Sequence, residues 1–364
     1  MRRALHVVVP GPLEQRTGGY LYDARMVAGL REAGWQVVVH NLEGLFPAGD
    51  KVASRSVELV FAAIGDGSWV LIDGLALVAS VEVVERHAKR LMLLSLVHHP
   101  LSDETGLAAD ESSLFLTKER RALRLMRGVI VTSQFTSSRL QRIGVQQGRI
   151  RIVVPGTDPV MHRVKQLSVE VPRLLVVGSV IPRKGHDVLI RALSTLRMQP
   201  WHCVCAGSLD RDRCFADGIV TQAREAGISK RIKFIGECDS STLEQLYAGA
   251  SIFVLPSYYE GYGMVLAEAL AYGLPIVSTT GGAIPETVPS GTGLLVAPGD
   301  YQALAHVLGR LLDGEAGSAL RRRYAKVAHE HGTKLLSWST AIKTMEKSLF
   351  EFGWSNTSAC GDDE

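Results

Sequence analysis

The sequence lacks the features that mark several protein classes. Its five cysteines show no paired C-x-x-C spacing and their number is odd, which is typical of a protein from a reducing compartment. The formal net charge of +3 is too small to indicate nucleic-acid binding. The apolar run at residues 4–10 is far shorter than a membrane span, and the start is not signal-like. We therefore expect a cytoplasmic protein that does not bind nucleic acid.

Hydrophobic residues make up 46% of the 364 positions, enough to form the cores of two ordinary domains. Short β-branched runs alternate with helical patterns throughout, which indicates parallel sheets with crossover helices. One such helix is predicted over 20–33, ended by Gly34. The pattern predicts strands at 4–9, 36–40, 69–72, 92–97, 128–131, 150–154, 174–177, 202–206, 232–235, 252–255, 275–278 and 293–296.

The organisation along the chain predicts two domains. The segment 155–172 contains three prolines and lacks strong periodicity, so we interpret it as an interdomain linker. We expect a first domain over 1–165 and a second over 166–333. Residues 334–364 are expected to form a C-terminal helix followed by a polar tail.

Residues 257–271 (SYYEGYGMVLAEALA) are the most informative stretch. A predicted strand runs into them, so Glu260 should lie in a loop at the carboxyl end of that strand. Gly261 and Gly263 allow the backbone to turn sharply and to approach a ligand closely. The helix that begins near Gly263 carries Glu268, and its first free N–H groups form an anion site.

The two glutamates suit a ligand with hydroxyl groups on either side of an anion. A fully helical span would separate Glu260 from Glu268 by about 12 Å, whereas the two carboxyl groups of a glycosidase lie about 5–9.5 Å apart. A nucleoside diphosphate sugar has the matching layout of sugar, pyrophosphate and ribose. The alternative, two solvated glutamates on a surface helix, is disfavoured by the glycine turn that follows a buried-type strand.

This stretch is followed by AYGLPIVS at 271–278 and GGAIPE at 281–286. In this order the motifs resemble the signature of retaining glycosyltransferases of family 4, the glycosyl transferases group 1, with the likeness densest over 174–300. The resemblance implies the α/β GT-B fold, in which two facing Rossmann-like domains with parallel sheets flank a deep interdomain cleft. It also implies that the C-terminal helix packs back on the first domain, where Trp338 would be the anchor.

The predicted turn at 178–186 (GSVIPRKGH) carries two adjacent cations. Arg183 can meet phosphate oxygens as a planar fork and Lys184 as a point charge, although a solvated basic turn is the alternative. The resemblance implies that Lys184 matches the diphosphate lysine of the family. Ser179 stands where the family often has an arginine, and we take Arg183 as its substitute.

The first half carries a paired glycine at a predicted helix start. Gly18 and Gly19 permit close backbone approach to a phosphate or a sugar, although a plain turn is the alternative. The resemblance implies that this loop faces the donor diphosphate and the acceptor, with Tyr20 on the acceptor side.

Two histidines follow the fourth predicted strand. A histidine at this strand end titrates near neutral pH, although ordinary loop histidines are the alternative. No third ligand at metal spacing is visible in the sequence, so we predict no zinc site. The resemblance implies that His98 lies near the transferred sugar. His99 and Glu104 are predicted to line the acceptor side.

Other strand-end loops carry weaker predictions. By resemblance, Gly207 and Glu237 would flank the nucleobase and ribose, although tight turns explain these loops equally well. Asp210-Arg-Asp212 has the form of a metal motif but lies at the start of a predicted helix, where aspartate is a common cap. The family generally needs no metal, and we predict neither a metal nor a cofactor.

A basic face is predicted over residues 116–126. If these residues are helical, Arg120, Arg124 and Arg127 share one face at i, i+4 and i+7. With apolar neighbours, that face could dock on anionic lipid at the inner side of the membrane. A solvated face is the alternative.

The motifs, with what the family resemblance implies, predict a metal-independent, retaining hexosyltransferase of glycan, glycolipid or glycoconjugate biosynthesis. It would move a sugar from a nucleotide donor, UDP-sugar favoured and GDP-sugar second, to an acceptor hydroxyl. Glu260, His98 and Lys184 are the predicted catalytic residues. The predicted donor-binding residues are Gly18, Gly19, Arg183, Lys184, Gly207, Glu237, Glu260, Gly261, Tyr262, Gly263, Met264, Val265 and Glu268. A sugar phosphorylase or nucleotide-sugar epimerase on the same fold, and a non-catalytic nucleotide-sugar-binding module, remain alternatives.

Overall fold

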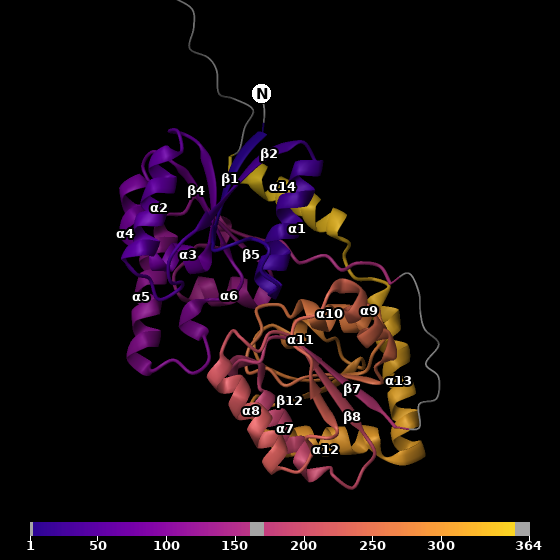
Figure 1. The fold of residues 1–364 in the computed structure, drawn as a ribbon. Coiled ribbons are helices and arrows are strands. Elements are labelled where there is room, and N and C mark those ends of the chain that lie inside the picture. The colour runs from indigo at the N-terminus through magenta and orange to yellow at the C-terminus, as the bar shows by residue number, and fades with distance from the viewer. Residues whose placement is uncertain (1–2, 161–170, 354–364) are drawn as a thin grey trace, which may run out of the picture. The chain divides into compact units, whose positions relative to one another are not determined.

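The computed structural model describes residues 3–160 and 171–353 of the chain. The chain divides into two compact units: unit 1 consists of Met1–Gly156 and Trp338–Glu364, and unit 2 of Thr157–Ser337. Each unit is built around a six-stranded parallel sheet (Figure 1). The boundaries expected from sequence were 165/166 and 333/334. The expected linker, 155–172, falls largely on residues 161–170, which lie outside the described part.

The twelve predicted strands are all present, and five of them have the predicted bounds. The sheet of unit 1 has the order β2-β1-β3-β4-β5-β6 and that of unit 2 the order β12-β11-β10-β7-β8-β9. The strands are β1 Arg3–Pro10, β2 Trp35–Leu42, β3 Trp69–Asp73, β4 Met92–Val97, β5 Gly128–Val131, β6 Ile150–Ile152, β7 Arg173–Val177, β8 His202–Ala206, β9 Ile232–Phe234, β10 Ile252–Leu255, β11 Ile276–Thr279 and β12 Gly293–Val296.

Helices lie in the connections between these parallel strands, and three more follow β12, the last described strand. Those of unit 1 are α1 Gly18–Glu32, α2 Lys51–Ala63, α3 Gly74–Ala79, α4 Val81–His87, α5 Ala109–Leu125, α6 Gln134–Arg142 and α14 Trp338–Glu351. Those of unit 2 are α7 His186–Thr195, α8 Arg213–Glu225, α9 Ser240–Gly249, α10 Met264–Ala271, α11 Ile284–Thr287, α12 Tyr301–Leu312 and α13 Gly314–Gly332. Among the described residues, no helix combines the length and apolar content that crossing a membrane requires.

The sheet of unit 2 is buried on both faces because its strands are almost wholly apolar. Alternate residues of β10 show this: Val254 belongs to one buried cluster and Phe253 to another. Cys203 and Cys205 belong to the same buried cluster as Val254 and are 1% and 2% exposed, so both cysteines pack in the core.

The last helix among the described residues, α14, packs on unit 1 beside α1 (Figure 1). The Trp338 ring lies 6.1 Å from the Tyr22 ring, so its predicted contact with the first part of the chain is confirmed. Trp35 Nε1 donates to Glu346 Oε1 over 2.8 Å. A Cβ atom on Gly29 would lie 1.9 Å from Ile342 Cδ1, so the helices approach so closely that only glycine fits.

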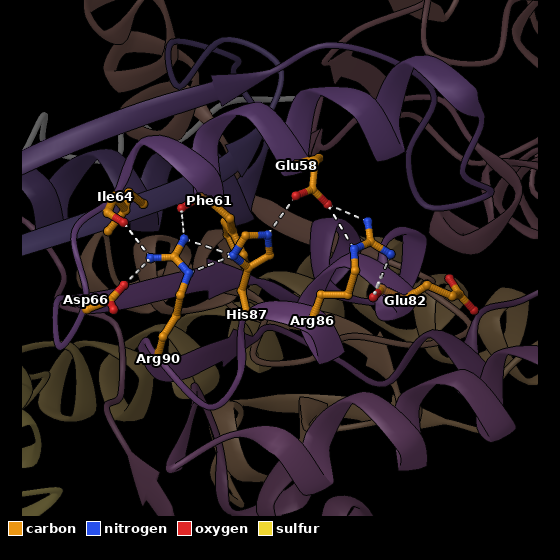
Figure 2. A network of polar contacts seen from close by, with 8 residues as sticks. All are labelled: Glu58, Phe61, Ile64, Asp66, Glu82, Arg86, His87 and Arg90. Atoms are coloured by element: carbon orange, nitrogen blue, oxygen red, sulfur yellow. Dashed lines mark hydrogen bonds and ion pairs between the residues drawn. The ribbon is translucent and has the colours of Figure 1, made fainter.

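A polar network joins α2 to α4 on the surface of unit 1 (Figure 2). His87 Nε2 lies 2.8 Å from Glu58 Oε1, and Arg86 also donates to Glu58. Arg90 donates to the carbonyl oxygens of Phe61 and Ile64 at the end of α2. Phe61 O also accepts from Ile64 N over 3.2 Å, and Arg90 adds a side-chain donor at both carbonyls. Arg90 thereby attaches the end of α2 to the segment after α4.

Candidate active site

Glu260 lies just beyond the carboxyl end of β10 and is 5% exposed. Lys184 Nζ lies 2.6 Å from its Oε1 atom and Arg183 Nη1 lies 3.5 Å from Oε2. Ser257 Oγ donates to Oε1 over 2.6 Å. Burial alone would raise the pKa of Glu260, but Lys184 and Arg183 together lower it below the ordinary value. The carboxylate is therefore charged and held by two cations.

The backbone of Glu260 is fixed by the glycine turn at 281–286. Glu260 forms a parallel bridge with Gly282, and its carbonyl oxygen accepts from Ala283 N over 2.8 Å. Gly282 has φ +63°, and a Cβ there would lie 2.2 Å from Glu260 O. Glu286 is exposed in α11. The two sequence motifs therefore form one packed element.

Helix α10 begins where the sequence predicts it to begin. Gly263 is the N-cap, has φ +85° and makes no side-chain cap, so the first N–H groups of the helix receive no side-chain acceptor there. The predicted donor residues Gly261, Tyr262, Met264 and Val265 lie at this helix start and are partly buried. The geometry is that of an anion site at a helix N-terminus.

Glu268 lies in the second turn of α10 and has a partner that the motif analysis missed. Tyr247 Oη donates to Glu268 Oε2 over 2.7 Å. The Tyr247 ring stacks on Tyr272 at 5.1 Å and on Phe253 at 5.8 Å. Burial raises the pKa of Tyr247 well above its ordinary value, so its hydroxyl stays a donor. In the sequence, Tyr247 looks like an ordinary core position of a helix.

The loops after β7, β8 and β9 are joined by main-chain hydrogen bonds. Gly178 N donates to Ala206 O, and Gly207 N donates to Gly236 O, both over 2.8 Å. The stem of Lys184 passes beside Gly178, where a Cβ would lie 3.4 Å from Lys184 Cε. Gly207 is therefore brought near the Lys184 turn, whereas the Glu237 residue is exposed in its loop.

Asp212 accepts from Phe215 N over 3.0 Å at the start of α8. The prediction that this aspartate is a helix cap is confirmed.

In unit 1, His98 follows β4 and faces two buried carboxylates. His98 Nε2 lies 3.1 Å from Asp23 Oδ1 and 3.8 Å from Asp73 Oδ2. Burial alone would lower the pKa of His98, but Asp23 and Asp73 together raise it. Burial and the Asp23 charge raise the pKa of Asp73 to about 7. In the described part of the chain, this is a group whose atoms, within 4.8 Å of one another, could hold a metal ion.

Neither aspartate was predicted as a site residue. Asp23 lies on the buried, apolar face of α1 with Met26, Val27 and Leu30. A carboxylate at a core position of a helix is unusual and could have marked Asp23 as a site residue from the sequence. Asp73 precedes a glycine at a strand end and looks like a turn residue. Of the predicted residues, Gly19 is brought against His98: a Cβ on Gly19 would lie 3.2 Å from His98 Cδ2.

The predicted acceptor residues are divided between two places in unit 1. His99 Nε2 lies 3.0 Å from Glu104 Oε2. Their loop is anchored by buried Glu119, which accepts from Leu101 N over 2.6 Å and from Ser102 N over 3.1 Å. Tyr20 instead donates to Pro10 O, and Gly18 is exposed at the start of α1.

The predicted arginine face on α5 is wrong in its third member. The helix ends at Leu125 and Met126 is extended, with ψ 137°, so Arg127 lies outside the helix. Arg127 Nε donates to Phe352 O over 3.2 Å, and Arg120 Nε donates to Ile143 O over the same distance. The three side chains therefore do not form the helical face that the spacing predicted.

Comparison with known proteins finds a family match within the second unit. Residues 159–331 match the family model described as glycosyl transferases group 1. The D-inositol 3-phosphate glycosyltransferase of Nocardia farcinica is 31% identical over 245 residues, which are 62% of this chain and 53% of that protein. The chain spans about half the length of the curated relatives it matches.

Two solved structures resemble nearly the whole chain. Sucrose-phosphate synthase from Thermosynechococcus elongatus has a TM-score of 0.78 at 24% identity, covering 95% of this chain and 98% of that one. Anabaena HepE, solved in complex with UDP and glucose, has a TM-score of 0.73 at 19% identity, covering 95% and 99%. These likenesses, with the two parallel sheets, confirm the predicted GT-B fold.

Proposed function

We propose that this chain, a member of the glycosyl transferases group 1 with a GT-B fold, is a retaining glycosyltransferase. It transfers a hexose from a nucleoside diphosphate sugar to an acceptor hydroxyl. The observation that carries this proposal is the cluster on Glu260. A buried, charged carboxylate is paired with Lys184 and Arg183 beside the uncapped start of α10.

The cluster supplies separate groups for the separate parts of a donor. Lys184 has three N–H donors, so it can keep its contact with Glu260 and also meet a phosphate oxygen. Arg183 and the N–H groups from Gly261 to Met264 complete the diphosphate site. Glu260 then binds hydroxyls of the sugar. Glu268, oriented by Tyr247, binds the ribose hydroxyls.

The reaction requires stabilisation of the leaving diphosphate while positive charge develops on the sugar ring. The bond between the anomeric carbon and the phosphate oxygen breaks, and the acceptor oxygen bonds to the same face of that carbon. The acceptor proton passes to the leaving phosphate oxygen. The negative charge on the diphosphate grows as it leaves. Cations and helix N–H groups that are already in place stabilise the diphosphate more in the transition state than in the bound donor, and this difference accelerates the step. His98 contacts the sugar in this proposal.

A uridine donor is favoured over a guanosine donor. The support is that HepE, which shares the fold, was solved with UDP and with UDP-glucose. The acceptor belongs to unit 1 in this proposal, with the His99–Glu104 pair as a candidate contact.

Two experiments test the proposal. A thermal-shift panel of UDP, GDP and ADP should give its largest stabilisation with UDP, because a ligand that binds only the folded state raises apparent stability. Glu260→Gln should lower transfer at least about 100-fold while nucleotide binding persists, since the amide keeps the volume and loses the charge. Glu268→Ala should raise the dissociation constant of the donor about tenfold, or about 1.4 kcal/mol.

Glu330→Gln, on the exposed side of α13, is the matched control and should behave as wild type. Wild-type turnover in both Glu260→Gln and Glu268→Ala would contradict the site. Release of sugar phosphate that depends on inorganic phosphate would favour a phosphorylase instead. A protein that binds UDP-sugar but never hydrolyses it, even slowly without acceptor, would be a binding module.

A further inference from the structure

The two carboxylates beside His98 leave only one of its ring nitrogens for a ligand. Asp23 Oδ1 and Asp73 Oδ2 both lie nearest to Nε2, at 3.1 and 3.8 Å. The side chains of Asp23 and Asp73 are 3% and 6% exposed, whereas that of His98 is 22% exposed. A buried carboxylate at hydrogen-bond distance favours a proton on the nitrogen that faces it, so Nε2 carries a hydrogen and donates to Asp23. Nδ1 is then the ring nitrogen available to an outside group.

The ring is held by residues from several elements of unit 1. Asp73 cannot turn freely, because its Oδ1 atom accepts from Leu75 N over 2.8 Å and caps α3. Tyr22 meets the ring edge-on at 5.5 Å. Gly19 lies beside the Cδ2 edge of the ring, where a Cβ atom would be only 3.2 Å from Cδ2. The orientation of His98 is thus fixed before any ligand arrives.

We propose that Asp23 is a positioning residue for His98: it holds the proton on Nε2, so that a hydroxyl of the bound sugar meets Nδ1. This inference rests on the proposed transferase function, in which His98 contacts the sugar. Asp73 adds a second carboxyl group on the same side of the ring, 3.8 Å from Nε2. The arrangement follows the general rule that the hydrogen bond of one imidazole nitrogen decides what the other can do.

The variant Asp23→Asn tests the proposal. The amide retains the shape of the carboxylate but can donate to Nε2, so the imidazole is no longer held in one tautomer. The assay is UDP-glucose hydrolysis. We expect kcat to fall at least about tenfold and KM to stay within about twofold, because the variant changes the orientation of His98 in the reaction step and not the binding of the donor. Loss of the Asp23 charge lowers the pKa of His98, so the acid limb of the kcat profile should move to lower pH.

Unit 1 contains a matched control. His87 and Glu58 form another histidine–carboxylate pair, 2.8 Å apart, in the α2–α4 network (Figure 2). Glu58→Gln should leave kcat and its pH profile unchanged. Asp23→Glu, which restores the charge, should recover part of the rate.

A double-mutant cycle separates positioning from folding. If Asp23 acts through His98, Asp23→Asn should not slow an enzyme that already carries His98→Gln. Equal rate losses with and without His98 would overturn the proposal. A metal requirement would also overturn the proposal. If EDTA abolishes activity, Mn²⁺ or Zn²⁺ restores it, and Asp23→Asn no longer responds to the metal, the cluster is a cation site.

Nitrogen-15 NMR of the histidine rings provides a readout that needs no turnover. The His98 signals, assigned by their loss in His98→Gln, should show Nε2–H in the wild type and a mixture of tautomers in Asp23→Asn. An unchanged tautomer would overturn the positioning role. If the wild type neither binds nor hydrolyses UDP-glucose or GDP-mannose, the proposed function fails, and the NMR result still decides whether Asp23 controls His98.

Discussion

The two units carry opposite charge arrangements at equivalent places of the same kind of sheet. In unit 2, one carboxylate, Glu260, follows β10 and is held by two cations. In unit 1, one imidazole, His98, follows β4 and is held by two carboxylates. The parallel sheet brings loops together at the carboxyl ends of its strands in both units. The side chains gathered at that edge, from loops and from helix α1, decide whether the place attracts an anion or a proton.

The pKa values of Glu260 and Asp73 differ for this reason. Two cations outweigh the effect of burial on Glu260 and lower its pKa, whereas burial and a neighbouring charge raise the pKa of Asp73 to about 7. Burial of a carboxylate therefore has no fixed consequence for its charge. The number and sign of the groups around it decide the outcome.

The largest effect should come from breaking the unit 2 cluster. Lys184→Met removes the nearest cation from buried Glu260 and leaves only Arg183, at 3.5 Å, to balance its charge. Breaking a buried ion pair in this way should cost about 3 kcal/mol of unfolding free energy. Stabilisation by UDP should be lost in the same variant. Urea unfolding and thermal shift measure the two effects. Lys233→Met, at an exposed position of β9, is the control, and an equal result for both lysines would contradict the comparison.

A second prediction concerns acid pH in unit 2. His186 is fully buried, and burial lowers its pKa to about 4. Above about pH 6.5 it is neutral in both states and has no effect. As the pH falls from 6.5 to 4, the unfolded chain binds a proton that the folded chain does not, so stability falls by about 3 kcal/mol. His186→Leu should remove this part of the pH dependence of urea unfolding.

Unit 1 should respond with the opposite sign. The folded-state pKa values of Asp73 and His98 are raised, so the folded protein binds more protons and loses stability as the pH rises toward and through 7. His6 and His40 oppose this trend, because burial lowers their pKa values. The test is therefore the difference between wild type and Asp73→Asn, which should lose less stability from pH 5 to 8. Hydrogen exchange resolved by unit measures it, and an identical profile would contradict the prediction.

The smallest effect distinguishes two neighbouring glycines of α1. A Cβ on Gly18 meets nothing within 4 Å, whereas one on Gly19 meets the His98 ring at 3.2 Å. Gly18→Ala should therefore stabilise unit 1 by about 0.5 kcal/mol through reduced chain entropy. Gly19→Ala should gain nothing and should shift the His98 ring signals in NMR. Equal stabilisation by both would show that the ring is not held where the structure has it.

The strands and the residues of the Glu260 cluster could be predicted from the sequence. Strand bounds follow from β-branched runs between turn residues, and five strands were predicted with their observed ends. Helix α10 begins after Gly263 because a glycine with φ +85° is available there. In these cases the determining residues are neighbours in the sequence, so local patterns are sufficient.

The missed residues depend on contacts between distant segments. Asp73 and His98 are 25 positions apart in the sequence, and Asp23 lies on a helix that precedes both. Tyr247 reaches Glu268 from a separate helix. No spacing rule joins such positions until the order of the strands is known. The end of α5 before Arg127 was missed for a related reason, because the Arg127 backbone N–H pairs with Leu93 O in β4 over 2.7 Å.

The return of α14 to unit 1 has a consequence for biosynthesis. A ribosome completes all of Thr157–Ser337 before it makes the helix that packs against Gly29 and Trp35. The sequence of unit 2 is thus inserted within that of unit 1. Unit 2 can fold while unit 1 still exposes the surface that α14 will cover. In a released chain truncated after residue 337, we expect unit 2 to resist protease and unit 1 to be cut.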